Sequence, residues 1–165
     1  MDYTYVHLLA NTVPVLGSVI GMIVLGIGIY NESKATINAS YIIFIFGALG
    51  AGITYYTGKW AEESIKNYSD ISLATIEQHK FIAEGALVTL IILALVSAYA
   101  LWYSVKKYPL SRNFNYVVLA VAFVSFAISA ATAGLGFSIR HPEVSPQQES
   151  NESPMEEVQY EEMKE

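Results

Sequence analysis

The sequence of 165 residues has no cysteine, little charge and only three histidines. The absence of cysteine excludes disulfide bonds, thiolate metal sites, cysteine-attached haem and cysteine lipidation. Charged residues make up 15% of the chain and hydrophobic residues 53%, whereas a typical soluble domain is about 25% charged. The composition therefore predicts an integral membrane protein.

The few charges are segregated along the chain. Three long windows contain no charged residue, and a fourth contains only Glu84. Because about 20 apolar residues cross the hydrocarbon core of a bilayer, each window predicts one transmembrane helix, at about residues 8–30, 41–59, 79–104 and 114–140. A cleaved signal peptide is not expected, since the first window lacks a basic leader and is long for a signal sequence.

Four spans joined by short polar segments predict an all-α integral membrane fold, an antiparallel four-transmembrane-helix bundle over residues 1–141. The polar segments predict a turn at Asn31–Ser40, a longer loop at Lys59–Gln78 and a tight basic turn at Ser104–Asn113. Residues 142–165 hold eight Glu and one Lys with no apolar period, which predicts a disordered acidic C-terminal tail.

Small residues recur at helical spacing in the second and fourth spans, so they share one face of each helix. Such faces let helices approach closely in lipid, which is the commoner explanation, and they also leave room for a flat cofactor. The residues are Gly47, Ala51, Thr54 and Gly58 in the second span, and Ser125, Ser129, Thr132 and Gly136 in the fourth.

The three histidines, His7, His79 and His141, fall on the same side of the membrane when four spans are threaded back and forth. Each could be an interfacial residue with its polar tip among the headgroups. Alternatively, they could share a cofactor, because imidazole is a common ligand of haem and of metal ions. A b-type haem needs two facing imidazoles, which His7 and His79 could supply. All three histidines could instead bind one Zn or Cu ion.

Polar residues near these histidines are candidates to support a ligating imidazole, which usually donates its second ring N–H to a nearby acceptor. Asn11 lies one turn below His7 on the same predicted helix face, and Thr12 lies beside it. Glu84 is a third candidate, but it is also spaced to form an i, i+4 ion pair with Lys80. No catalytic residue is assigned.

Several of these segments resemble a bacterial membrane family known as domain of unknown function 2231. That family opens its first span with His-Pro-x-x-Val-His-Phe-Pro. The stretch HLLANTVP keeps the first His as His7 and the last Pro as Pro14, while the family's second His falls on Thr12 and its first Pro on Leu8. The later motifs match GALGAGITYYTGKW in the second span, His79 at the start of the third, and Gly134 followed by His141 after the fourth.

Relatives in that family are sometimes fused to Rieske or cytochrome c modules, so the resemblance implies membrane redox work in the bacterial inner membrane. The resulting hypothesis is a small membrane protein with a haem b or a Zn or Cu ion near one face and an electron-transfer role. Its expected partners are the lipid bilayer and other membrane redox subunits, with no nucleic acid. The alternative is a cofactor-free structural or assembly subunit of a larger membrane complex.

The orientation in the membrane rests on weak cues. Positive residues near the spans are tied at four on each side, with Lys34, Lys106, Lys107 and Arg112 opposing Lys59, Lys66, Lys80 and Arg140. The basic residues of the last hairpin are concentrated in one short turn, and the N-terminal head has no positive side chain. These two cues predict that both termini are periplasmic.

Overall fold

The computed structural model describes residues 3–65, 73–106 and 111–140. Over these ranges the chain forms α1 (Tyr3–Tyr30), α2 (Lys34–Ile65), α3 (Leu73–Lys106) and α4 (Arg112–Arg140), with no strand. All four helices are long and apolar enough to cross a membrane. The predicted all-α membrane fold with four spanning helices is confirmed, whereas His141 and the acidic tail at 142–165 lie outside the described residues.

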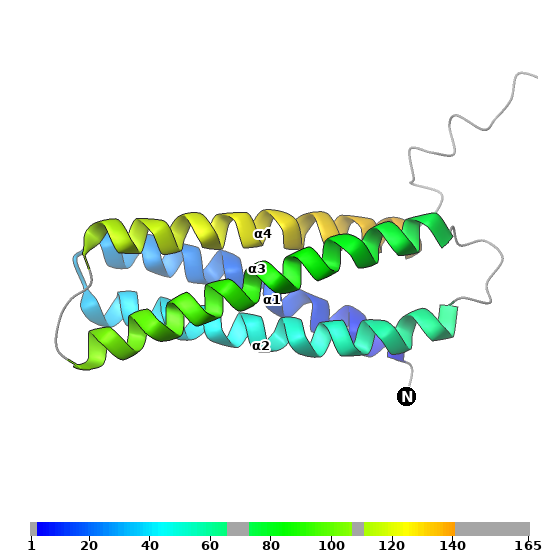
Figure 1. Ribbon diagram of the computed structural model, residues 1–165, viewed down its shortest axis with the longest axis horizontal. Helices are drawn as coiled ribbons and strands as arrows, with labels where there is room; N and C mark the ends of the chain where they lie inside the picture. The colour runs from blue at the N-terminus through cyan, green and yellow to red at the C-terminus, as the bar shows by residue number, and fades with distance from the viewer. Residues whose placement is uncertain (1–2, 66–72, 107–110, 141–165) are drawn as a thin grey trace, which may run out of the picture.

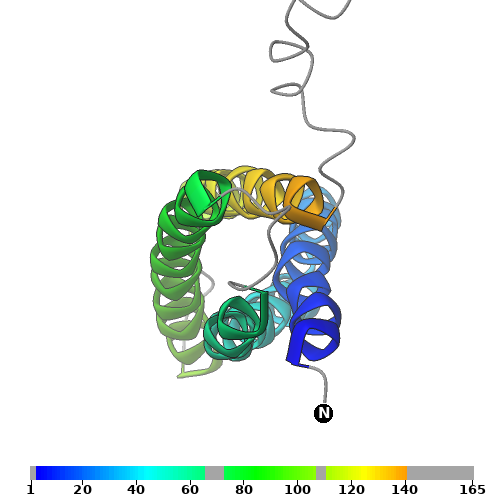
Figure 2. The ribbon, with the colours of Figure 1, turned by 90° about the vertical axis from the view of Figure 1, so that its right-hand side faces the viewer.

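The four helices form a closed ring in which each packs against the next and α4 returns to α1 (Figure 2). They lie along the long axis of the molecule and alternate in direction (Figure 1). The start of α1 and the end of α4 therefore lie at one end, here called the histidine end because His7 and His79 lie near it. The opposite end is called the basic end because Lys106 and Arg112 lie there.

The turn between α1 and α2 is shorter than the predicted turn at Asn31–Ser40, because α2 already begins at Lys34. The amide of Ser33 donates to the carbonyl of Gly28 at 2.9 Å, and that of Glu32 donates to Ile29 at 3.4 Å. Glu32 has a φ of 53°, the left-handed conformation that ends a helix in this pattern. Ser33 then caps α2, since its Oγ accepts from the Thr36 amide at 3.3 Å.

The other two connections are also shorter than predicted. The expected loop at Lys59–Gln78 is helical at both ends, because α2 continues to Ile65 and α3 begins at Leu73. The expected turn at Ser104–Asn113 loses its first residues to α3 and its last two to α4. The end of an apolar window marks where a helix leaves the lipid. The helix itself can continue into water, because it ends only where its backbone hydrogen bonds end.

Close helix packing involves Gly47 of the small-residue face of α2 and the neighbouring Gly50. A Cβ on Gly17 of α1 would lie 3.1 Å from the Cα of Gly47, so the two backbones meet at this crossing. A Cβ on Gly50 would overlap a methyl carbon of Val13. Gly17 on α1 and Gly50 on α2 therefore let the two helices approach closely, as small residues do for helices in lipid.

The buried apolar core lies in the half of the bundle toward the basic end, where Leu25, Phe44, Leu93 and Val118 are fully buried. One polar bond crosses this core: the Tyr41 hydroxyl donates to Asn115 Oδ1 at 2.6 Å and joins α2 to α4. Only 22–33% of the most apolar window of each helix is buried inside the bundle. The remaining apolar surface faces outward, as it does in a protein surrounded by lipid.

Candidate functional site

His7 lies on the second turn of α1 and reaches across to α2. Its Nδ1 lies 3.0 Å from the main-chain carbonyl oxygen of Thr54, with the hydroxyl of Thr57 at 3.4 Å. A Cβ on Gly58 would lie 2.9 Å from His7 Cε1, closer than real carbon atoms approach. Glycine at position 58 therefore allows the imidazole to approach α2 closely and reach the carbonyl.

His79 lies on the second turn of α3 and makes an equivalent main-chain contact with α4. Its Nδ1 lies 3.0 Å from the carbonyl oxygen of Thr132. A Cβ on Gly136 would lie 3.3 Å from His79 Cε1, so the ring rests against a glycine here as well. The hydroxyl of Thr132 bonds to the Ile128 carbonyl one turn earlier in α4.

The two hairpins, α1–α2 and α3–α4, thus build the same half-site. In each, a histidine from the first helix donates to a threonine carbonyl of the second, and a glycine four residues later supports the ring. Each threonine hydroxyl also bonds to a carbonyl four residues earlier. The arrangement has an approximate two-fold symmetry about the long axis of the bundle.

The two half-sites bring their imidazoles together between the hairpins. The ring centroids of His7 and His79 are 6.4 Å apart, and the ring planes are inclined at 85°. Because a carbonyl oxygen only accepts hydrogen bonds, each neutral ring carries its proton on Nδ1 and keeps a lone pair on Nε2. A ligating histidine is usually held in this way, with the second nitrogen bonded to a backbone carbonyl or carboxylate.

The groups that support the imidazoles differ from the predicted ones. The Thr12 side chain is exposed, and its hydroxyl donates to the carbonyl of Leu9 at 2.7 Å. Asn11 is half-buried, and Glu84 is exposed on α3. The observed acceptors are the main-chain carbonyls of Thr54 and Thr132, which sequence reasoning missed because a carbonyl has no residue-specific pattern.

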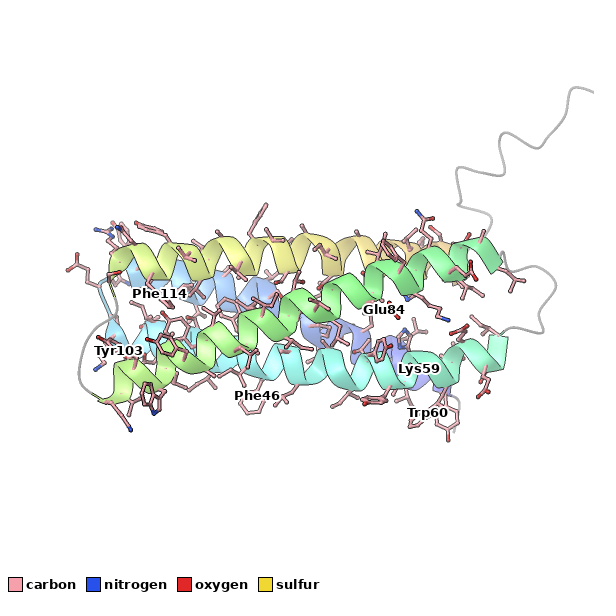
Figure 3. All side chains as sticks on the ribbon, viewed as in Figure 1. Phe46, Lys59, Trp60, Glu84, Tyr103 and Phe114 are labelled. Atoms are coloured by element: carbon pink, nitrogen blue, oxygen red, sulfur yellow. The ribbon has the colours of Figure 1, made fainter. Side chains whose placement is uncertain are left out.

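The predicted Lys80–Glu84 pair is wrong, because the Lys80 ammonium bonds to the carboxylate of Glu62 on α2 at 3.1 Å. Glu62 was expected in a loop, but the extension of α2 to Ile65 brings it level with the start of α3. Figure 3 shows Glu84 on α3 and Lys59 and Trp60 on α2 toward the histidine end. The Lys80–Glu62 pair joins the two hairpins, because Lys80 lies on α3 and Glu62 lies on α2. Each partner follows a half-site residue, since Lys80 comes directly after His79 and Glu62 lies one turn beyond Gly58.

No protein-family model matches the chain, and no curated protein or solved structure matches it. The resemblance to domain of unknown function 2231 stays a prediction. Within the described residues, no group of three His, Asp or Glu side chains is placed to hold a metal ion. His141, the third ligand of the hypothesised Zn or Cu site, lies outside the described ranges, so that hypothesis also stays a prediction.

Proposed function

We propose that His7 and His79 are the two axial ligands of a b-type haem, and that the protein carries electrons at one face of a membrane. The observation that carries this proposal is the pair of imidazoles, one from each hairpin, with centroids 6.4 Å apart and both Nδ1 atoms engaged by carbonyls. This combination leaves one nitrogen lone pair on each ring for a shared ligand.

The spacing of the rings fits two ligands on opposite sides of one metal atom. Such rings have centroids roughly 6 Å apart, since each metal–nitrogen bond is about 2.0 Å and each nitrogen lies about 1.1 Å from its ring centre. The observed 6.4 Å agrees with this value.

The number and symmetry of the ligands favour haem over a bare metal ion. A structural zinc ion takes four protein ligands in a tetrahedron, and the described residues bring together two histidines. A porphyrin supplies four nitrogens of its own and needs protein ligands only above and below its plane. The approximate two-fold relation of His7 and His79 supplies that pair.

Two histidine ligands also favour electron transfer over catalysis. A haem held by both His7 and His79 would supply one-electron chemistry. The chain's contribution would be to hold both rings in place through the Thr54 and Thr132 carbonyls. Small rearrangement on gaining or losing an electron is what an electron carrier requires.

The test is the absorbance spectrum of the full chain, purified in detergent from cells supplied with haem precursor. We expect a Soret band, sharp visible bands on reduction, and one haem per chain by extraction as the pyridine complex. Apoprotein titrated with hemin should saturate at the same ratio. A colourless protein containing zinc or copper would replace haem with the metal-ion hypothesis, and a protein containing neither would support the structural-subunit alternative.

A further inference from the structure

An aromatic and cationic patch lies on the outer surface of the basic end. Tyr99, Trp102, Tyr103 and Lys106 are spaced i, i+3, i+4 and i+7, so they share one face of the last two turns of α3. Tyr99 is the centre of the patch, with ring centroids 6.3 Å from Trp102, 6.2 Å from Tyr103 and 6.4 Å from Phe114 of α4. Figure 3 shows Tyr103 and Phe114 at the same end.

The cation of this patch, Lys106, contacts the aromatic ring of Trp102. The ammonium of Lys106 lies 4.7 Å from the centre of the Trp102 ring, within the range of a cation–π contact. Both side chains are exposed, with Trp102 at 53%. A cation over an aromatic face keeps its full charge and can still accept an anion from solvent or lipid.

The surrounding charge favours an anionic ligand. The sequence has no acidic residue between Glu84 and Glu143, and Lys106 and Arg112 lie near the facing ends of α3 and α4. The other charges at this end, Glu32 and Lys34 of the α1–α2 connection, are of opposite sign. Arg112 lies 6.0 Å from the ring centre of Tyr116, which makes a second cation–aromatic pair at this end. Basic clusters beside membrane helices attract acidic lipid headgroups.

The patch also lies at the depth of the headgroups. The exposed charged residues Glu84 and Lys106 bound the apolar stretch of α3 and are 22 residues apart, which is about 33 Å of helix. That length matches the hydrocarbon core of about 30 Å. Exposed Val88, Ile92 and Leu95 lie in between. Lys106 is therefore at the lipid–water boundary, and Trp102 lies one turn inside it.

From these contacts we infer that the patch binds the headgroup of an anionic phospholipid in the adjoining leaflet. The Lys106 ammonium pairs with the lipid phosphate, and Tyr99, Trp102 and Tyr103 pack against the glycerol and upper acyl chain. The cation supplies the preference for acidic headgroups, while the aromatic rings hold the lipid at the boundary. This inference is independent of any cofactor at the histidine end.

The two tryptophans of the chain, Trp60 and Trp102, lie at opposite ends and provide the probe. In a Trp60→Phe variant, Trp102 is the sole tryptophan, and brominated lipids quench its fluorescence when they occupy the patch. Vesicles with brominated phosphatidylglycerol or brominated phosphatidylcholine give the relative affinity. About 1 kcal/mol per basic residue corresponds to about fivefold preference for phosphatidylglycerol, decreasing with salt.

Matched variants separate the patch from general charge effects. In the Trp60→Phe background, Lys106→Gln should abolish the preference of Trp102 for brominated phosphatidylglycerol. Lys34→Gln, at the same end of the bundle, should leave that preference unchanged. In a Trp102→Phe variant, Trp60 should show no preference. Equal quenching of Trp102 by both lipids would overturn the inference, and so would a preference that survives Lys106→Gln. Loss of the preference on adding glycerol phosphate to the buffer would assign the site to a soluble phosphate instead.

Discussion

Replacing Gly58 by alanine tests whether the supporting glycine sets the position of the His7 ring. The new Cβ would lie 2.9 Å from His7 Cε1, whereas carbon atoms in contact prefer about 3.5–4.0 Å. The ring must therefore move by roughly 0.6 Å or more away from α2. Such a movement stretches the 3.0 Å contact between Nδ1 and the Thr54 carbonyl toward about 3.6 Å, where a hydrogen bond no longer exists.

The magnitude follows from the loss of that bond. Removing the group that orients a ligating histidine typically weakens metal binding by about 10- to 100-fold, so we expect hemin affinity to fall by this factor in Gly58→Ala. The folded apoprotein should not lose stability, because alanine is about 1 kcal/mol more favourable than glycine inside a helix. Gly136→Ala should have a smaller effect, since its Cβ would lie 3.3 Å from His79 Cε1.

The assay is a titration of each apoprotein with hemin, followed at the Soret band, together with thermal unfolding measured by circular dichroism. Gly134→Ala and Gly52→Ala are the matched controls, because a Cβ at either position meets no atom within 4 Å. Wild-type affinity in Gly58→Ala would refute the reasoning. A loss in Gly134→Ala as large as that in Gly58→Ala would show that any added methyl group weakens binding, whatever its contact with the histidine.

The ligand pair, the polar bond in the core and the helix crossing give three further predictions. His7→Ala and His79→Ala should each remove the two-imidazole haem spectrum from purified protein, measured as haem per mole; full haem content in both folded variants would exclude the pair as ligands. Tyr41→Phe leaves Asn115 Oδ1 buried without its donor and should lower the free energy of unfolding by about 1–3 kcal/mol, which denaturant titration in detergent micelles measures; an unchanged midpoint would contradict this. Gly17→Leu cannot be accommodated where the backbone of α2 is 3.1 Å from the added Cβ, so the variant should elute as aggregate in size-exclusion chromatography, and a monodisperse peak would argue against a tight crossing.

Sequence patterns located the helices because a bilayer requires long apolar windows, and those windows are visible in composition alone. The even number of spans was enough to place His7 and His79 at one end. The helix ends were not predictable in the same way. Residues 34–40 and 61–65 are helical but partly polar, and hydropathy reports where the lipid stops rather than where the backbone hydrogen bonds stop.

The groups that contact and orient the two imidazoles could be predicted only in part from the sequence. Thr54 with Gly58 and Thr132 with Gly136 stood out as members of small faces, which suggested helix packing or cofactor space. Their repeated four-residue spacing on the partner helix of each histidine was the available clue to a common role. What could not be read was that main-chain carbonyls accept the imidazole protons, since every residue has a carbonyl and only the fold selects two of them.

The repeated half-site divides the candidate site equally between two units, the α1–α2 hairpin and the α3–α4 hairpin. Each hairpin contains one imidazole, its acceptor and its glycine, so the complete centre exists only while the hairpins stay side by side. A ligand bound by both imidazoles would therefore stabilise the association of the two hairpins, and this effect grows as the ligand concentration rises above its dissociation constant. We accordingly expect that a chain cut in the connection between α2 and α3 would reassemble in the presence of the proposed haem, and that haem absorbance would measure the extent of reassembly.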